Sequence, residues 1–169
     1  MSGTTLRRAL PAAAAAITLA AAVSGAGLAA ASTRSAVSGA EHFQLMTTSA
    51  TSKTSSLVAT GVFTAGGTNT DTSNSTGTAK FANGTFVITH SKGTGTQSFN
   101  PNTCLFKASL TGTYTLGSGT GAYAGISGSG TYALSIIGVG ATSGGTCSKT
   151  LAPVAFQQVI RASGPVSLP

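Results

Sequence analysis

Few side chains in this chain could carry out acid–base or metal chemistry. Its 169 residues include two acids and two histidines, namely Glu41, Asp71, His42 and His90. Glycoside hydrolysis generally needs two carboxylates across one bond, but Glu41 lies near the amino end and Asp71 in a predicted loop. The spacing of the acids and histidines matches no metal-ligand motif. We therefore expect no metal, no cofactor and no hydrolytic centre.

Residues expected to face a shared interior are better candidates for a binding site. His90 ends the alternating segment Thr85–His90 on its apolar face, where it can be a hydrogen-bonded structural residue or face a ligand. Tyr114, Tyr132 and Gln158 fall on apolar faces of other segments. They can orient a ligand in a mostly apolar pocket or satisfy one another in a filled core. The ligand-pocket candidates are His90, Tyr114, Tyr132, Gln158, Phe106 and Phe156.

Met1–Ala31 has the features of a secretory signal peptide. Arg7 and Arg8 form a positive amino-terminal region, Ala9–Val23 is an apolar run rich in alanine, and Ala29–Ala31 is a small-x-small cleavage signature. The apolar run is shorter than the roughly 20 residues that a membrane-spanning helix needs. The paired arginines leave twin-arginine export open as a minor alternative. We expect a secreted protein without a stable membrane anchor after cleavage.

The cleavage site defines the expected domain organisation. A cut after residue 31 leaves Ser32 as the new terminus, and Ala40 offers a second site. We expect a flexible leader over residues 32–40 and one domain over residues 41–169. The formal charge falls from +7 to +5 once the two arginines of the signal segment are lost. The excess arises from scarce acids and the bases are not clustered, so we expect no nucleic-acid partner. Loose association with anionic envelope polymers is compatible with this charge.

Cys104 and Cys147 are the two cysteines of the chain. An even number of cysteines in an exported protein indicates a disulfide. Closing a loop of this length should stabilise the fold by roughly 4 kcal/mol. A catalytic thiol is the alternative.

Short alternating segments, interrupted by Gly, Asn, Ser and Thr, must position these residues. The expected strands are Glu41–Thr48, Leu57–Ala65, Lys80–Ala82, Thr85–His90, Cys104–Leu116, Ser129–Leu134 (with Ile136 continuing its apolar face) and Val154–Ser163. Asn83-Gly84 predicts a type I′ hairpin turn, and Gly66–Gly77 is expected to be a loop. No part of the chain after the signal segment has a sustained helical period. About eight short strands predict an all-β fold, a closed antiparallel β-barrel or failing that a sandwich, preceded by a cleavable signal helix.

The glycine-rich crossing Gly117–Gly130 contains Gly119, Gly121, Tyr123 and Gly125. It resembles the G-x-G-x-(Tyr/Phe)-x-G segment of the allene oxide cyclase/dirigent-like barrel superfamily, and more narrowly its secreted actinobacterial members. The resemblance covers about a fifth of the chain after the signal segment. It implies that this segment links two barrel strands, that the aromatic residue anchors the turn, and that hydrophobic or phenolic molecules bind in the barrel. No position matches the catalytic residues of that superfamily, and none is carried over.

Three functions follow as hypotheses. The first is a secreted barrel that is not an enzyme and binds a small apolar ligand or serves the cell envelope. The second, which rests on the resemblance, is a cyclase- or isomerase-like enzyme acting through preorganised shape. The third is a structural or adhesion module. An eight-stranded barrel can hold packed side chains or one small ligand, so an open interior favours the first two hypotheses and a filled one the third.

Overall fold

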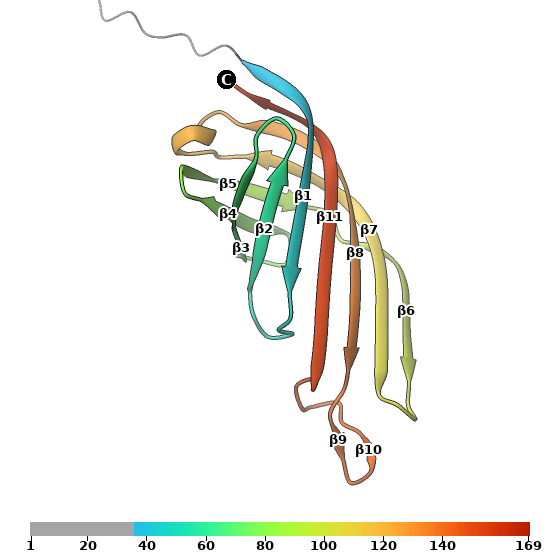
Figure 1. Cartoon of the computed structure of the whole chain (residues 1–169). Helices are drawn as coiled ribbons and strands as arrows, with labels where there is room; N and C mark the ends of the chain where they lie inside the picture. Colours follow the sequence, from blue (N-terminus) through green and yellow to red (C-terminus); the bar gives the residue numbers. More distant parts are fainter. Residues whose placement is uncertain (1–35) are drawn as a thin grey trace, which may run out of the picture. The chain divides into compact units, whose positions relative to one another are not determined.

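The computed structural model describes residues 36–169 (Figure 1). The expected signal peptide and signal helix lie outside the described residues. The described part consists of strands and one 3-10 helix: β1 (Val37–Thr47), β2 (Thr54–Thr60), β3 (Ala65–Asp71), β4 (Thr76–Phe81), β5 (Gly84–His90), β6 (Thr94–Asn100), β7 (Leu105–Gly117), η1 (Gly121–Tyr123), β8 (Ser127–Val139), β9 (Thr142–Ser143), β10 (Thr146–Cys147) and β11 (Ala155–Leu168). None of the helices found in this part could cross a bilayer.

The main sheet closes on itself. Its strands follow the order β5-β4-β3-β2-β1-β11-β8-β7, and β5 pairs in turn with β7. Every pairing is antiparallel. The prediction of an eight-stranded antiparallel barrel is therefore confirmed. Closure leaves no free edge along this part of the sheet, which suits strands rich in threonine and poor in charge.

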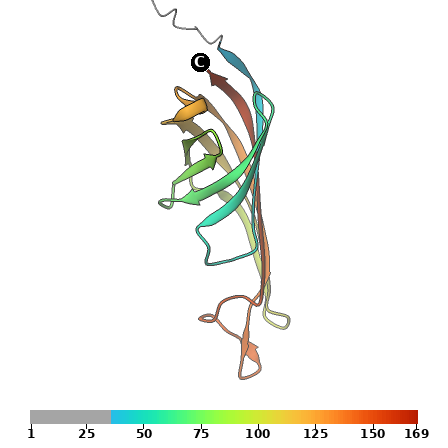
Figure 2. The same ribbon diagram turned by 60° about the vertical axis from the view of Figure 1, so that its left-hand side comes forward.

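A ninth strand, β6, lies outside the closed barrel. The end of β7, Tyr114–Gly117, pairs with β5, whereas its first half pairs with β6. The sheet of β6, β7, β8 and β11 therefore continues beyond the barrel as an open extension, which Figures 1 and 2 show reaching past the ends of β2–β5. We call this extension the tongue. It comprises residues 94–100, 105–108, 136–139 and 155–157.

Aromatic side chains pack one end of the barrel. The ring of Tyr123, from η1, lies 5.0 Å from Phe63, 5.3 Å from Phe81 and 5.5 Å from Phe86 between centroids. Phe43 adds an edge-on contact with Phe86 at 6.0 Å. Aromatic pairs at such distances add to the stability gained by burying their area. The glycine-rich crossing thus covers the packed end, with Tyr123 as its buried contact.

The β4–β5 hairpin explains why the crossing needs glycine. The Ala122 N–H donates to the Asn83 carbonyl at 2.8 Å. A Cβ at Gly84 would collide with the carbonyl of Thr120, and one at Gly121 with the carbonyl of Asn83. The hairpin was expected, but its turn was misassigned. Phe81 pairs with Gly84, so residues 82 and 83 form the turn, and their φ angles are not positive as type I′ requires.

Several segment boundaries differ from those expected. The expected strand Leu57–Ala65 is divided, because β2 ends at Thr60 and the chain turns at Gly61, whose φ is 139°. β1 begins at Val37, so residues 37–40 of the expected leader pair with β11. A cut after Ala40 would remove these paired residues. β3 lies in the segment expected to be a loop, because its inward positions hold small or polar residues. At Gly67, for example, a Cβ would lie 2.8 Å from the Phe81 ring. β6 was missed because all seven of its residues are exposed, so burial imposes no apolar alternation.

Candidate functional site

A cavity of about 190 Å³ lies in the barrel beside the packed aromatic end. Phe43 and Tyr114, in edge-on contact at 6.0 Å, belong both to its wall and to the packed core. The apolar wall residues are Phe43, Leu45, Ile88, Leu134, Ile160 and Ala162. The remaining lining residues are Asn69, Asp71, Gly77, His90, Tyr114, Tyr132 and Gln158. The wall thus joins His90, Tyr114, Tyr132 and Gln158, four of the six residues proposed from the sequence.

A glycine opposite Tyr132 helps to keep the cavity open. Gly112 pairs with Tyr132 across β7 and β8, and a Cβ there would lie 2.6 Å from the tyrosine ring. The ring therefore lies over Gly112, and its hydroxyl donates to the Ser91 carbonyl at 2.9 Å. His90 meets the same ring edge-on at 6.0 Å. Tyr132 is thus held against the wall of the barrel.

His90 has one ring nitrogen committed to the backbone. Its Nδ1 lies 3.1 Å from the Ser91 carbonyl oxygen. Because a carbonyl can only accept, this contact is a hydrogen bond when Nδ1 carries a proton. A neutral ring in that tautomer keeps Nε2 as an acceptor. His90 can therefore offer an acceptor on the wall of the cavity.

Two polar atoms of the cavity wall have no hydrogen-bond partner among the described residues: Oδ1 of Asn69 and the hydroxyl of Tyr114. Asn69 is 5% exposed and Tyr114 is 3% exposed. The amide nitrogen of Asn69 donates to Asp71 Oδ1 at 3.0 Å, which fixes the orientation of the amide. Leaving such a buried group unpaired costs about 1–3 kcal/mol. Both residues line the cavity, so its wall holds polar groups whose hydrogen-bonding capacity the described residues do not use.

Glu41, which was expected near the amino end of the domain, is a buried acid. It is fully buried. The Phe63 N–H donates to its Oε2 at 3.1 Å, and its Oε1 has no partner within residues 36–169. Burial raises the pKa of Glu41, only partly offset by backbone hydrogen bonds. Burial, and then the charge of Glu41, raise the pKa of Tyr114. Glu41 does not line the cavity.

The signal for Glu41 was its position in the alternation of the first strand. Glu41 precedes Phe43 by two residues and Leu45 by four, so the three side chains point to the same face of the strand. All three are buried, whereas the residues between them are exposed. Across the sheet, Glu41 pairs with Gly164 and Tyr114 with Gly130. A Cβ at Gly164 would collide with the Ser129 carbonyl and one at Gly130 with the Ser163 carbonyl, so these two glycines allow β8 and β11 to approach closely.

Phe106 and Phe156 lie outside this cavity. They line a groove of about 390 Å³ on the tongue, together with Phe99 and Ile136. Their rings are 6.3 Å apart across Gly138, where a Cβ would collide with the Phe106 ring. The alternation of apolar and polar residues correctly predicted that the two phenylalanine side chains lie on the same face of the sheet as the cavity residues. The closing strand β5, however, reaches only Tyr114–Gly117 of β7, so this part of the face is not enclosed.

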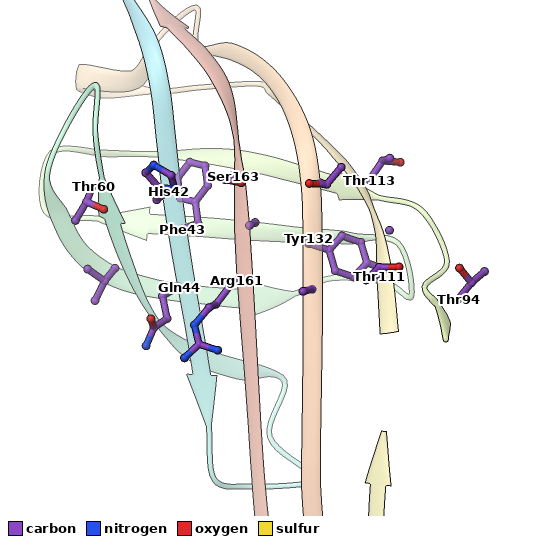
Figure 3. A pocket seen from close by; sticks show the side chains of 15 residues that line it. His42, Phe43, Gln44, Thr60, Thr94, Thr111, Thr113, Tyr132, Arg161 and Ser163 are labelled. Atoms are coloured by element: carbon purple, nitrogen blue, oxygen red, sulfur yellow. The ribbon is translucent and has the colours of Figure 1, made fainter. Parts of the chain in front are cut away.

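The outer wall of the barrel carries a broad depression of about 850 Å³ (Figure 3). Most of its side chains come from outward positions on β1, β2, β7, β8 and β11, and Thr94 of β6 also lines it. Gln44 and Arg161 are neighbours across β1 and β11, and both are exposed. No polar side chain here is buried and unpaired. We therefore place the candidate site in the interior cavity.

Cys104 and Cys147 form the predicted disulfide, which joins the start of β7 to β10. The bridge excludes the alternative of a catalytic thiol. The described residues contain no group of three His, Cys, Asp or Glu that could hold a metal ion. Comparison of the chain with family models, curated proteins and solved structures finds no match.

Proposed function

We propose that this is a secreted protein that is not an enzyme and binds one small, mostly apolar molecule inside its barrel. The observation that carries the proposal is the interior cavity, which has apolar walls and two unpaired polar atoms. Ligand sites typically combine an apolar lining with a few polar groups that fix orientation. An open interior also favours binding over a structural module with a filled barrel. The disulfide is compatible with an extracellular location.

The size of the cavity limits the ligand. An engineered cavity of about 150 Å³ binds benzene, and the cavity here is about 190 Å³. A single ring with one or two added heavy atoms therefore fits. Oδ1 of Asn69 can accept a hydrogen bond, and the Tyr114 hydroxyl can donate or accept one. We infer that the ligand carries a hydroxyl group that pairs with these atoms.

Benzyl alcohol and toluene form a matched pair of probes, because both have one ring and one of them carries a hydroxyl. We expect ligand-observed NMR to detect both, with benzyl alcohol bound more tightly. Tyr114→Phe should weaken benzyl alcohol about 5- to 10-fold, as expected for one hydrogen bond of about 1 kcal/mol. The same substitution should leave toluene nearly unchanged.

A substitution that fills the cavity provides the second arm of the test. Leu134→Phe should abolish binding of both probes. Val58→Phe adds similar bulk on the outer face, where Val58 is 51% exposed, and should bind both probes as the unmodified protein does. Absence of binding at millimolar concentration, or equal binding by the two variants, would refute the proposal.

An enzyme of the cyclase or isomerase type is the second candidate. The unpaired Tyr114 hydroxyl favours it, because a preorganised donor in a dry site can stabilise charge that develops during a reaction. If a cavity ligand is converted to product, Tyr114→Phe should lower turnover far more than it lowers binding. Unchanged turnover in this variant would remove the support for an enzyme.

A further inference from the structure

The wall of the interior cavity carries charge of one sign, apart from the titratable His90. Asp71 lines the cavity, and none of the lysines and arginines that the structure describes does so. This is unexpected from the composition, because the chain has nine lysines and arginines against two acids. The second acid, Glu41, is buried elsewhere in the barrel and does not line the cavity. The cavity should therefore favour a ligand with a positive charge over one with a negative charge.

Asp71 and His90 lie where the cavity meets the surface of the barrel. Both residues line the interior cavity, and both also line a depression of about 310 Å³ formed with exposed loop residues. Asp71 is exposed, whereas His90 is half-buried. Lys53 lines the outer depression but not the cavity. We call Asp71 and His90 the mouth of the cavity.

The polar groups at and beside the mouth are hydrogen-bond acceptors. Asp71 Oδ1 accepts from the Asn69 amide at 3.0 Å, which leaves Oδ2 for another donor. His90 offers Nε2 when its Nδ1 donates to the Ser91 carbonyl. Oδ1 of Asn69 is buried and has no partner among the described residues. The Asn69 amide lies over Gly77, where a Cβ would be 2.7 Å from this oxygen.

We propose that the ligand of this cavity carries a protonated amine, which binds at the mouth. A primary ammonium group has a positive charge, three N–H donors and no acceptor, so it complements one carboxylate and two neutral acceptors. Hydrogen bonds between charged partners are roughly twice as strong as those between neutral ones. The inference rests on the proposed function, because it concerns the same cavity. Since the mouth opens to the surface, the ammonium group needs no room beside the apolar part of the ligand.

Toluene, benzyl alcohol, benzylamine and benzoate test the inference, because they share one ring and differ in charge. Ligand-observed NMR at about pH 8, where histidine is ordinarily neutral, should show benzylamine bound at least about 5-fold more tightly than benzyl alcohol. Benzoate should bind more weakly than toluene. Raising salt from about 0.1 to 0.5 M should weaken benzylamine and leave benzyl alcohol nearly unchanged, because salt screens an exposed carboxylate. These comparisons use the unmodified protein.

Variants then locate the charge that the amine recognises. Asp71→Asn removes the charge but keeps an oxygen that can accept from the Asn69 amide. It should abolish the preference for benzylamine over benzyl alcohol and leave toluene nearly unchanged. The matched control Lys53→Gln removes a charge from the outer depression alone and should keep the preference. Leu134→Phe should abolish benzylamine binding as well, because the ring of the amine lies inside the cavity.

The outcomes separate this inference from the proposed function. If toluene and benzyl alcohol bind and benzylamine binds no more tightly than benzyl alcohol, the amine is ruled out while the apolar cavity remains a binding site. Benzoate bound as tightly as benzylamine, or a preference for benzylamine that persists in Asp71→Asn, would also overturn the inference. If none of the four probes binds, the proposed function and the inference both fail.

Discussion

The buried carboxyl of Glu41 makes a testable prediction about pH and stability. Burial raises the pKa of Glu41 in the folded protein, whereas the unfolded chain should have the ordinary value of about 4.3. Between these two values the folded state holds a proton that the unfolded state has lost. Stability therefore falls as pH rises through this window. It is highest below the ordinary pKa and becomes constant above the folded pKa.

The size of this effect is bounded by one proton. A single group whose pKa is raised on folding can change the free energy of unfolding by at most about 1.4 kcal/mol per pH unit. Glu41→Gln removes the titration but keeps an oxygen that can accept from Phe63 N–H. The free energy of unfolding of this variant, minus that of the unmodified protein, should therefore increase with pH above about 4.3.

Urea unfolding at a series of pH values between about 4 and 8 measures this difference. Asp71→Asn removes the other, exposed acid and serves as the control, because it should retain the fall in stability with rising pH. If Glu41→Gln and the unmodified protein lost stability in parallel, the pH dependence would not arise from Glu41. If the unmodified protein became more stable than Glu41→Gln as pH rose, the sign of the argument would be wrong.

Two further predictions concern stability. Replacing both Cys104 and Cys147 by alanine should lower the free energy of unfolding by about 4 kcal/mol, since the bridge spans 43 residues; urea unfolding of oxidised protein checks this, and a loss below about 1 kcal/mol would contradict it. Gly130→Ala should cost about 1–3 kcal/mol, because its Cβ would collide with the Ser163 carbonyl. Gly66→Ala, where nothing lies within 4 Å, should be nearly neutral, and equal losses in thermal unfolding would refute the packing argument.

Much of the barrel was readable from alternation. The segments that became β1, β7, β8 and β11 alternate between exposed and less exposed side chains along most of their length, and such a pattern distinguishes the inner from the outer face. β3 and β6 were missed for opposite reasons. β3 fills its inward positions with Ala65, Gly67 and Asn69, and β6 buries none of its residues. A strand without apolar alternation gives no signal in the sequence.

The candidate site could be predicted only in part. The alternation of side chains along each strand predicted that His90, Tyr114, Tyr132 and Gln158 point inward, and the closed barrel brings them together around one cavity. The same alternation predicted that Phe106 and Phe156 point inward, but these two residues line the groove on the tongue instead. Asn69 could not be found, because its polar side chain in a segment rich in glycine and threonine resembles a loop residue.

The sequence by itself determined an all-β chain, the face on which each strong strand places its side chains, and the disulfide. It could do so because side-chain direction in a strand has a period of two residues and because the chain has two cysteines. Tertiary structure alone decided where the inward face becomes a cavity and where it stays open. That depends on which part of β7 meets β5, a pairing between distant segments that no local pattern encodes.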